Sequence, residues 1–245
     1  MPIVYLVGAG PGNPEFLTVK ADRLIQSADA VLYDRLILPA VLERAKPGAM
    51  MLAAGRAPGR RGIPQDEVNQ QMIDLARQGL KVVRLKGGDP MVFGRGGEEV
   101  RALMEAGIAV EVVPGISSAW GALTLAGIPA THRGVSAMVT VVSGHDPARL
   151  PWDHLAALGG TLVFLMAVSQ LTAIVRQLIG HGMGGQVPAA VIEKASWPDQ
   201  RVLISRLEDL PQLAEEQRVA PPSIIVVGDV VGVLPEARFG RWGQS

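Results

Sequence analysis

The sequence KVVRLKGGDPMVFGRGGEE, at residues 81–99, joins a strand to a helix through a glycine-rich loop. Its first five residues are a short run with β-branched side chains, typical of a strand, and residues 97–105 have a helical pattern. From Leu85 to Glu99, five glycines, one proline and five charged residues share 15 positions. Glycine lets a ligand approach backbone N–H and C=O groups closely. The stretch therefore predicts a ligand-binding loop within an α/β fold.

The same alternation of strand and helix continues on both sides of this loop. In the first half, strands are expected at residues 3–7, 30–33, 50–53, 81–85 and 109–113, and helices at 15–27, 64–78 and 97–105. Strands that alternate with helices predict a parallel or mostly parallel sheet.

The second half continues this style without repeating the motifs. Strands are expected at residues 137–142, 161–165, 188–192, 201–204 and 224–227, and helices at 152–158, 169–179 and 207–216. We expect the domain change between Pro114 and Gly134, which gives an N-terminal domain at 1–114 and a C-terminal domain at 115–245. The predicted fold class is α/β, with two α/β domains and a ligand cleft between them, because ligands commonly bind between domains.

Composition excludes several classes of protein. The 245 residues are 48% apolar and 19% charged, which rules out a disordered chain. Lysine plus arginine equals aspartate plus glutamate at 23 each, and aromatic residues are 4%, so we expect no nucleic-acid partner. Cysteine is absent, which excludes disulfides and thiolate metal sites and fits a cytoplasmic protein.

No membrane span, signal peptide or metal site is expected. The uncharged stretches at 112–131 and 155–175 are interrupted by glycine, proline or polar residues, unlike a spanning helix. The amino terminus lacks the basic region and cleavage site of a signal peptide. The four histidines, at 132, 145, 154 and 181, do not have the spacing of metal ligands.

Two further loops follow expected strands and precede helices. The first, GAGPGN at residues 8–13, could open a dinucleotide-binding fold with Asp34 on the ribose, but Asn13 replaces the third glycine of that motif. A tight turn without a ligand is the alternative. The second, VPGISSA at 113–119, places Ser117 and Ser118 at a helix start, where their hydroxyls could bond a ligand or cap the helix.

Charged side chains in the loop at 85–99 indicate polar ligands. Asp89 can accept hydrogen bonds from a hydroxyl or an ammonium group, and Arg95 can hold a carboxylate with two parallel bonds. The alternative is that these charges pair with one another.

Five segments together resemble the tetrapyrrole methylase family, and the resemblance runs essentially end to end. They are residues 7–12, 33–36, 84–99, 113–118 and 131–134. The resemblance implies a two-domain α/β enzyme, usually a homodimer, that uses S-adenosylmethionine and releases S-adenosylhomocysteine. It is greatest to the members that methylate uroporphyrinogen III at C2 and C7, giving precorrin-2, the precursor of sirohaem, cobalamin and haem d1.

The resemblance also implies roles for individual residues. Asp34 would be the active-site acid, which could take the proton that leaves the methylated macrocycle. Arg56 stands where the family usually has a lysine, which is sometimes assigned as a proton donor. A guanidinium keeps its proton near neutral pH, so Arg56 would act by charge alone. The implied cofactor contacts are Pro11, Gly87, Gly88, Asp89, Val92, Ser117, Ser118, Met166 and Ala195, the last in place of a family glycine. The implied substrate contacts, for a tetrapyrrole with eight carboxylates, are Arg35, Arg95, Glu98 and Arg133.

Three alternatives remain open on the sequence. The first is a sister enzyme of the same fold that acts on a later corrin intermediate. The second is a methyltransferase of the same superfamily that acts on ribosomal RNA or a modified protein histidine, which the neutral charge and few aromatic residues disfavour. The third is a dinucleotide-dependent oxidoreductase, which Asn13 and the loop at 85–99 disfavour.

Overall fold

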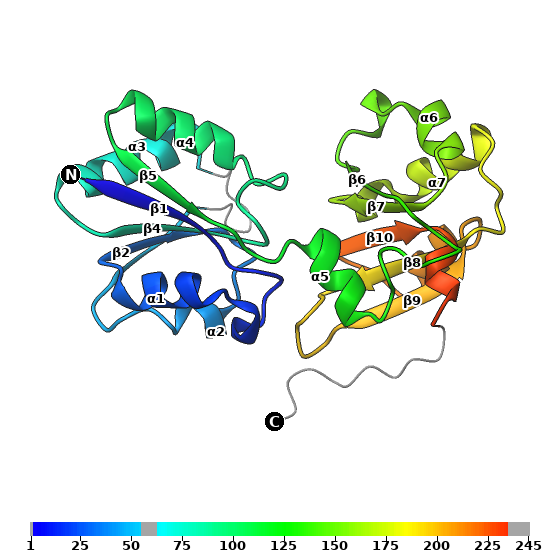
Figure 1. Cartoon of the computed structure of the whole chain (residues 1–245), viewed down its shortest axis with the longest axis horizontal. Coiled ribbons are helices and arrows are strands. Elements are labelled where there is room, and N and C mark those ends of the chain that lie inside the picture. The colour runs from blue at the N-terminus through cyan, green and yellow to red at the C-terminus, as the bar shows by residue number, and fades with distance from the viewer. Residues whose placement is uncertain (1, 55–62, 235–245) are drawn as a thin grey trace. The chain divides into compact units, whose positions relative to one another are not determined.

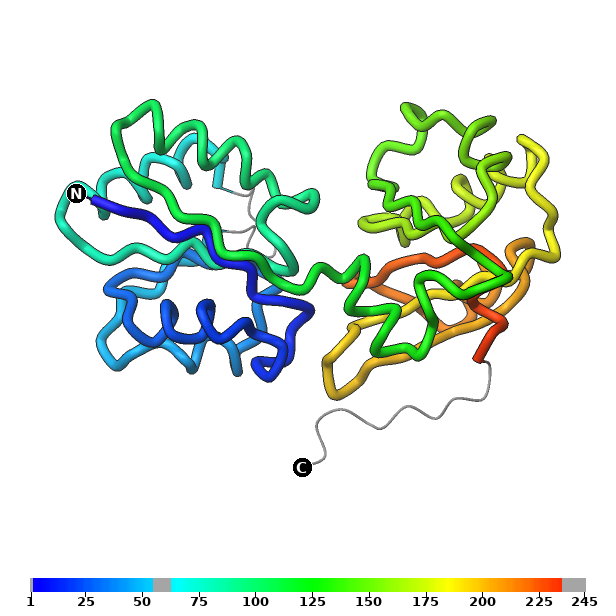
Figure 2. The backbone as a smooth tube through the Cα atoms, viewed as in Figure 1, coloured from blue at the N-terminus to red at the C-terminus, as the bar shows by residue number. Residues whose placement is uncertain are grey.

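The structure is a computed structural model that describes residues 2–54 and 63–234. The chain divides into two compact units, residues 1–117 and 118–245, so it passes from one to the other once (Figures 1 and 2). Each unit contains a five-stranded sheet with helices packed on it, which confirms the predicted α/β class.

The first unit is built on a parallel sheet, as expected. Its strand order is β3-β2-β4-β1-β5. The strands are β1 (Ile3–Gly8), β2 (Ala30–Tyr33), β3 (Met50–Ala53), β4 (Val82–Lys86) and β5 (Ala109–Val113). The helices are α1 (Val19–Ser27), α2 (Pro39–Leu42), α3 (Gln65–Arg77) and α4 (Gly96–Glu105), with a 3-10 turn η1 (Pro14–Phe16).

Helices cover both faces of this sheet (Figure 1). On one face, Met72 of α3 and Leu103 of α4 pack on Val82 of β4. On the other face, Ile25 of α1 and Val41 of α2 pack on strand residues that include Val83 and Leu85. Alternate residues of a strand point to opposite faces, so β4 contributes to both cores.

Two element boundaries in the first unit differ from expectation. The helix expected at residues 15–27 is split into η1 and α1, because Thr18 caps the start of α1. Its Oγ1 accepts a hydrogen bond from the N–H of Ala21 at 3.1 Å. The short helix α2, whose first residue is Pro39, was not expected; four residues are too few for a helical period to show.

The second unit has a mixed sheet, with the strand order β6-β7-β10-β8-β9. Only β6 and β7 pair in parallel, and the other three pairs are antiparallel. The strands are β6 (Val139–Ser143), β7 (Thr161–Leu165), β8 (Pro188–Glu193), β9 (Arg201–Arg206) and β10 (Ser223–Val227). The loop 194–200 is too short to carry a parallel crossover, so β8 and β9 form an antiparallel hairpin.

Helices also cover both faces of the second sheet. They are α5 (Ser118–Leu125), α6 (Trp152–Ala157), α7 (Leu171–Gly180) and α8 (Leu210–Glu216), with 3-10 turns η2 (Pro147–Arg149), η3 (Val168–Gln170) and η4 (Asp229–Gly232). The helices α6, α7 and α8 share a core around Phe164, while α5 and η4 share one around Val163. The helix expected from residue 207 begins at Leu210, because the N–H of Leu207 still bonds the carbonyl of Val187 at 2.8 Å.

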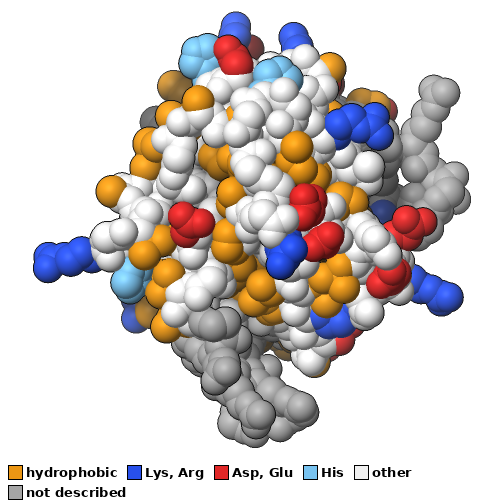
Figure 3. Space-filling view, turned by 90° about the vertical axis from the view of Figure 1, so that its right-hand side faces the viewer, with side chains coloured by type: hydrophobic (Ala, Val, Ile, Leu, Met, Phe, Trp, Pro, Cys, Tyr) orange, Lys and Arg blue, Asp and Glu red, His pale blue; other side chains and the backbone are white. Residues whose placement is uncertain are grey.

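The outer surface of the described residues is mixed in character. On the face that Figure 3 shows, Lys and Arg side chains stand apart from one another, among acidic and hydrophobic ones. Over the ranges 2–54 and 63–234, none of the helices has the length and apolar character needed to cross a bilayer.

Three glycines allow the ends of three strands in the first unit to approach closely. A Cβ added to Gly8, at the end of β1, would lie 2.6 Å from the Cα of Gly115 and 2.6 Å from the carbonyl oxygen of Gly88. Both of these atoms belong to backbone, which cannot rotate away as a side chain would. Glycine at position 8 therefore sets the distance between the loops that follow β1, β4 and β5.

We predict that Gly8→Ala destabilises the protein. The extra methyl group must push backbone apart, and such overpacking costs about 1–3 kcal/mol of unfolding free energy. Thermal and denaturant unfolding measure the change. The matched control is Gly97→Ala in α4, where an added Cβ meets nothing within 4 Å; equal stability of the two variants would contradict the prediction.

Candidate active site

The motif loops of the first unit lie at one edge of its sheet. In a parallel sheet the carboxyl ends of all strands share an edge, which is where ligands bind in such folds. Pro11 follows β1, Asp34 follows β2, Gly87 follows β4 and Ser117 follows β5. The structure thus brings together residues that are more than 100 positions apart in the sequence.

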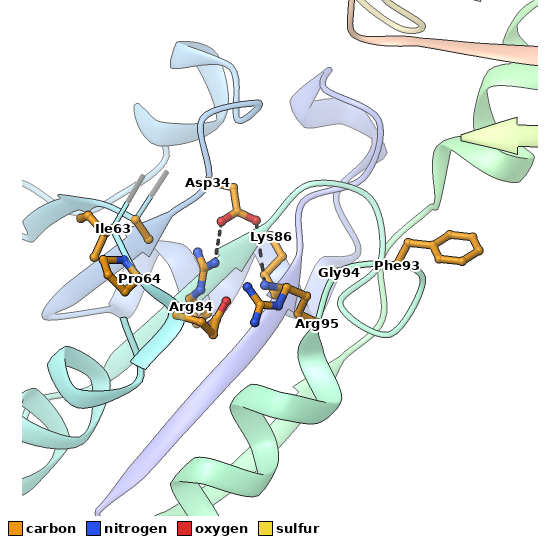
Figure 4. A pocket seen from close by; sticks show the side chains of 10 residues that line it. Asp34, Ile63, Pro64, Arg84, Lys86, Phe93, Gly94 and Arg95 are labelled. Atoms are coloured by element: carbon orange, nitrogen blue, oxygen red, sulfur yellow. Dashed lines mark hydrogen bonds and ion pairs between the residues drawn. The ribbon is translucent and has the colours of Figure 1, made fainter. Parts of the chain in front are cut away.

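Asp34 is held by two cations from the neighbouring strand. The Nη2 of Arg84 donates a hydrogen bond to Oδ1 of Asp34 at 2.5 Å, and the Nζ of Lys86 lies 4.0 Å from Oδ2. Figure 4 shows both side chains reaching from β4 toward the carboxylate. Arg84 and Lys86 are buried, whereas one third of the Asp34 side chain is exposed.

Sequence reasoning did not identify Arg84 and Lys86 as site residues. The signal was present: two cations alternate in the run VVRLK, so both lie on one face of an interior strand. A charge buried there is expensive unless it is paired. That cost would have predicted two acidic partners nearby.

A pocket of about 460 Å³ opens beside this ion pair. Its lining includes Asp34, Gln65, Arg84, Lys86, Phe93 and Arg95. Phe93 points away from the charged side chains in Figure 4, and the lining also contains Ala54, Ile63 and Pro64, so charged groups share the pocket wall with a few apolar ones. Such a wall suits an anionic group placed next to a carboxylate that can accept a proton.

Arg95 and Glu98, the expected substrate contacts, pair with each other in the structure. The Nε and Nη2 atoms of Arg95 donate to the two carboxylate oxygens of Glu98 at 3.0 and 2.6 Å. This hydrogen bonding raises the pKa of Arg95 and lowers the pKa of Glu98. Both side chains are more than half exposed, so a ligand carboxylate can reach the guanidinium by displacing Glu98.

The glycine loops are tied together by backbone hydrogen bonds and by Asp89. Gly10 and Gly88 exchange two backbone bonds, at 3.2 and 2.9 Å. The Oδ1 of Asp89 accepts from the N–H of Met91 at 2.8 Å, and its Oδ2 accepts from the N–H of Gly115 at 3.1 Å. The carboxylate of Asp89 therefore connects its own loop to the segment that follows β5.

Two expected cofactor contacts lie at one edge of the second sheet. Met166 directly follows β7, and Ala195 lies just after β8. These strands run in the same direction, since β10 between them is antiparallel to both. Met166, Lys194 and Ser196 have positive φ angles of 54, 51 and 69°. Such backbone is costly for residues other than glycine, and it concentrates at functional sites.

The remaining expected site residues have the following positions. Val92 and Arg35 are in the loops after β4 and β2, Ser118 is the first residue of α5, and Arg133 is an exposed turn residue of the second unit. Arg56 lies outside the described residues. Within the part of the chain that the structure describes, no group of three His, Asp or Glu side chains is placed to hold a metal ion.

We predict that Asp89→Ala destabilises the protein without any ligand present. The change leaves the N–H groups of Met91 and Gly115 without this acceptor. The Met91 bond is exposed, so the cost comes mainly from the half-buried N–H of Gly115 and is at most about 1–3 kcal/mol. Thermal unfolding of the ligand-free protein measures this. Asp74→Ala, at an exposed residue bonded to Gln70 on α3, is the control. An unchanged unfolding temperature for Asp89→Ala would mean that the carboxylate does not hold the loops together.

Comparison with known proteins gives relatives for both units. Residues 3–211 match the sequence model of the tetrapyrrole (corrin/porphyrin) methylases. The siroheme synthase of Pseudomonas fluorescens SBW25 is 46% identical over 245 residues, which are 99% of this chain and 53% of that protein. This chain therefore spans about half the length of the curated relatives it matches.

Solved structures match over nearly the whole chain. The uroporphyrin-III C-methyl transferase of Thermus thermophilus, complexed with S-adenosylhomocysteine, is 43% identical, with a TM-score of 0.80 over 94% of this chain and 99% of that one. A second structure of that enzyme is 44% identical, with a TM-score of 0.82 over 96% of each chain. Because the family model covers well over half of the residues, this chain belongs to the tetrapyrrole methylase family.

Proposed function

We propose that this chain transfers methyl groups from S-adenosylmethionine to C2 and C7 of uroporphyrinogen III and so produces precorrin-2. The observation that carries the proposal is the partly exposed carboxylate of Asp34, which Arg84 holds at the edge of a pocket beside the glycine loops. The high identity to a uroporphyrin-III C-methyl transferase supports the choice of substrate.

The residues at the two sheet edges fit S-adenosylmethionine. A Cβ added to Gly87 would meet only Leu36, at 3.9 Å, so its backbone is open to a ligand on that side. The Met166 side chain is half exposed at the end of β7. We propose Pro11, Gly87, Gly88, Asp89, Val92 and Ser117 of the first unit, and Ser118, Met166 and Ala195 of the second, as cofactor contacts.

The proposed chemistry needs alignment and a proton acceptor. Bound S-adenosylmethionine supplies a methyl group on a sulfonium centre, which a nucleophilic pyrrole carbon attacks as the bond to sulfur breaks. Asp34 accepts the proton that then leaves the macrocycle. The hydrogen bond from Arg84 occupies Oδ1 of Asp34, which leaves Oδ2 as the acceptor. Alignment of the methyl group with the attacking carbon contributes the remainder of the rate acceleration.

Cationic side chains of both units are the proposed contacts for the substrate's carboxylates. We assign Arg35, Arg95 and Arg133 this role, with Glu98 holding Arg95 in place until the substrate arrives. Arg56 binds a carboxylate by charge and donates no proton in this scheme. Four expectations from the sequence stay predictions. They are the division of these roles between domains at 1–114 and 115–245, the cleft between the domains, the homodimer and the cytoplasmic location.

An anaerobic assay tests the function directly. The protein is incubated with S-adenosylmethionine and enzymatically made uroporphyrinogen III, and the products are oxidised. The sirohydrochlorin absorption spectrum is the expected result, and it should be missing without S-adenosylmethionine. Cofactor binding without this product would favour the sister enzyme that acts on a later corrin intermediate.

We predict that Asp34→Asn loses turnover and keeps cofactor binding. The amide oxygen can still accept the bond from Arg84, so the fold is retained, but the amide cannot accept a proton. Loss of a general base lowers kcat by roughly 10²–10⁴-fold. Steady-state kinetics and calorimetry with S-adenosylmethionine measure the two effects, and wild-type turnover would remove the proposed role of Asp34.

A further inference from the structure

Three charged side chains are buried inside the first unit, behind Asp34. Arg84 and Lys86 are each 3% exposed, and Glu99 of α4 is fully buried. An ion moved from water into a protein interior loses its hydration at a large cost in free energy, so these groups depend on one another. Replacement of such groups by apolar residues is often neutral or stabilising. Stability alone therefore does not explain why three ions lie in this core.

Glu99 is the centre of this group. Its Oε1 accepts hydrogen bonds from Nε of Arg84 at 3.0 Å, from Nζ of Lys86 at 2.9 Å and from Nε2 of Gln65 at 3.0 Å. Its Oε2 is buried and has no hydrogen-bond partner among the described residues. One carboxylate oxygen thus fixes both cations.

The two cations connect Glu99 to Asp34. The guanidinium of Arg84 is held on three sides, by Glu99 through Nε, by Asp34 through Nη2, and by the carbonyls of Leu32 and Leu85 through Nη1. Lys86 lies 2.9 Å from Glu99 and 4.0 Å from Oδ2 of Asp34. The ammonium group is therefore bonded to Glu99 and kept out of hydrogen-bond range of Asp34.

We propose that Glu99 is a positioning residue. It holds Arg84 against Oδ1 of Asp34 and holds Lys86 away from Oδ2, so that Oδ2 stays available to the substrate. The inference rests on the proposed role of Asp34 as proton acceptor. It explains why the group is buried at the Glu99 end and most exposed at the other, where the side chain of Asp34 is 33% exposed.

The decisive variant is Glu99→Gln. The amide oxygen can replace Oε1 as acceptor, but the negative charge that attracts Lys86 is gone. Lys86 should then move to Oδ2 of Asp34 and occupy the proton acceptor. We expect kcat to fall roughly tenfold or more, a part of the full general-base effect, while KM for uroporphyrinogen III and Kd for S-adenosylmethionine change less than about twofold.

The matched control and a double variant separate positioning from stability. Glu105→Gln makes the same change at an exposed residue of the same helix, paired with Arg101, and should leave kcat unchanged. Glu99→Gln combined with Lys86→Met removes the ammonium group, so Oδ2 is free again and kcat should recover several-fold relative to Glu99→Gln. If Glu99 had a purely structural role, Glu99→Gln and the double variant would have lower unfolding temperatures, and kcat of the folded protein would be unchanged in both. That result overturns the inference.

A crystal structure of Glu99→Gln gives a readout that needs no activity. We expect the distance from Nζ of Lys86 to Oδ2 of Asp34 to shorten from 4.0 Å to that of a direct hydrogen bond. An unchanged distance overturns the inference, even if the wild type converts uroporphyrinogen III. An inactive wild type with a shortened distance in the variant would overturn the proposed function and support only the geometric part of the inference, that Glu99 holds Lys86 away from Asp34. If Glu99→Gln does not fold, Glu99→Asp takes its place in the same comparison. Aspartate keeps the negative charge, but its shorter side chain moves that charge away from Lys86.

Discussion

The burial of charge on strand β4 is the constraint on which the first unit depends. An arginine and a lysine point into a core otherwise made of Val, Leu, Ile, Met and Ala side chains, where an unpaired ion is strongly destabilising. Helix α4 must therefore bring Glu99 to that position, and β2 must end so that Asp34 lies over Arg84. The same pairing that makes the interior tolerable also fixes the carboxylate that faces the pocket. The ion pairs that stabilise the core therefore also determine the geometry of the site.

Much of the first unit could be predicted from local patterns. Its strands are short β-branched runs, its helices have clear periodicity, and glycine loops follow the strands, so the parallel sheet and the glycine-rich loops of the site both followed from the sequence. The mixed second sheet could not be predicted, because strand direction depends on which distant strand β10 joins. No local pattern specifies that β10 lies between β7 and β8.

The sequence pointed to candidate site residues mainly in or next to the conspicuous loops. Asp34 and Asp89 lie in such loops, whereas the partners that determine their geometry do not. Arg84, Lys86 and Glu99 are inside regular elements, and their contact requires β4 and α4 to be packed in one particular way. The loop position of Asp89 was evident from the sequence. The hydrogen bonds that it accepts from the N–H groups of Met91 and Gly115 were not. Motifs indicate where chemistry occurs, and packing determines which atoms are free to take part.

The single passage of the chain between its two units allows the protein to be divided. Each sheet is complete within one continuous segment, and each has its own core on both faces. Cutting the chain between Ser117 and Ser118 would therefore separate no strand from its neighbours. It would create a new amino terminus at the first residue of α5, whose positive charge is unfavourable at a helix start unless it is acetylated. The two halves are thus suited to separate expression.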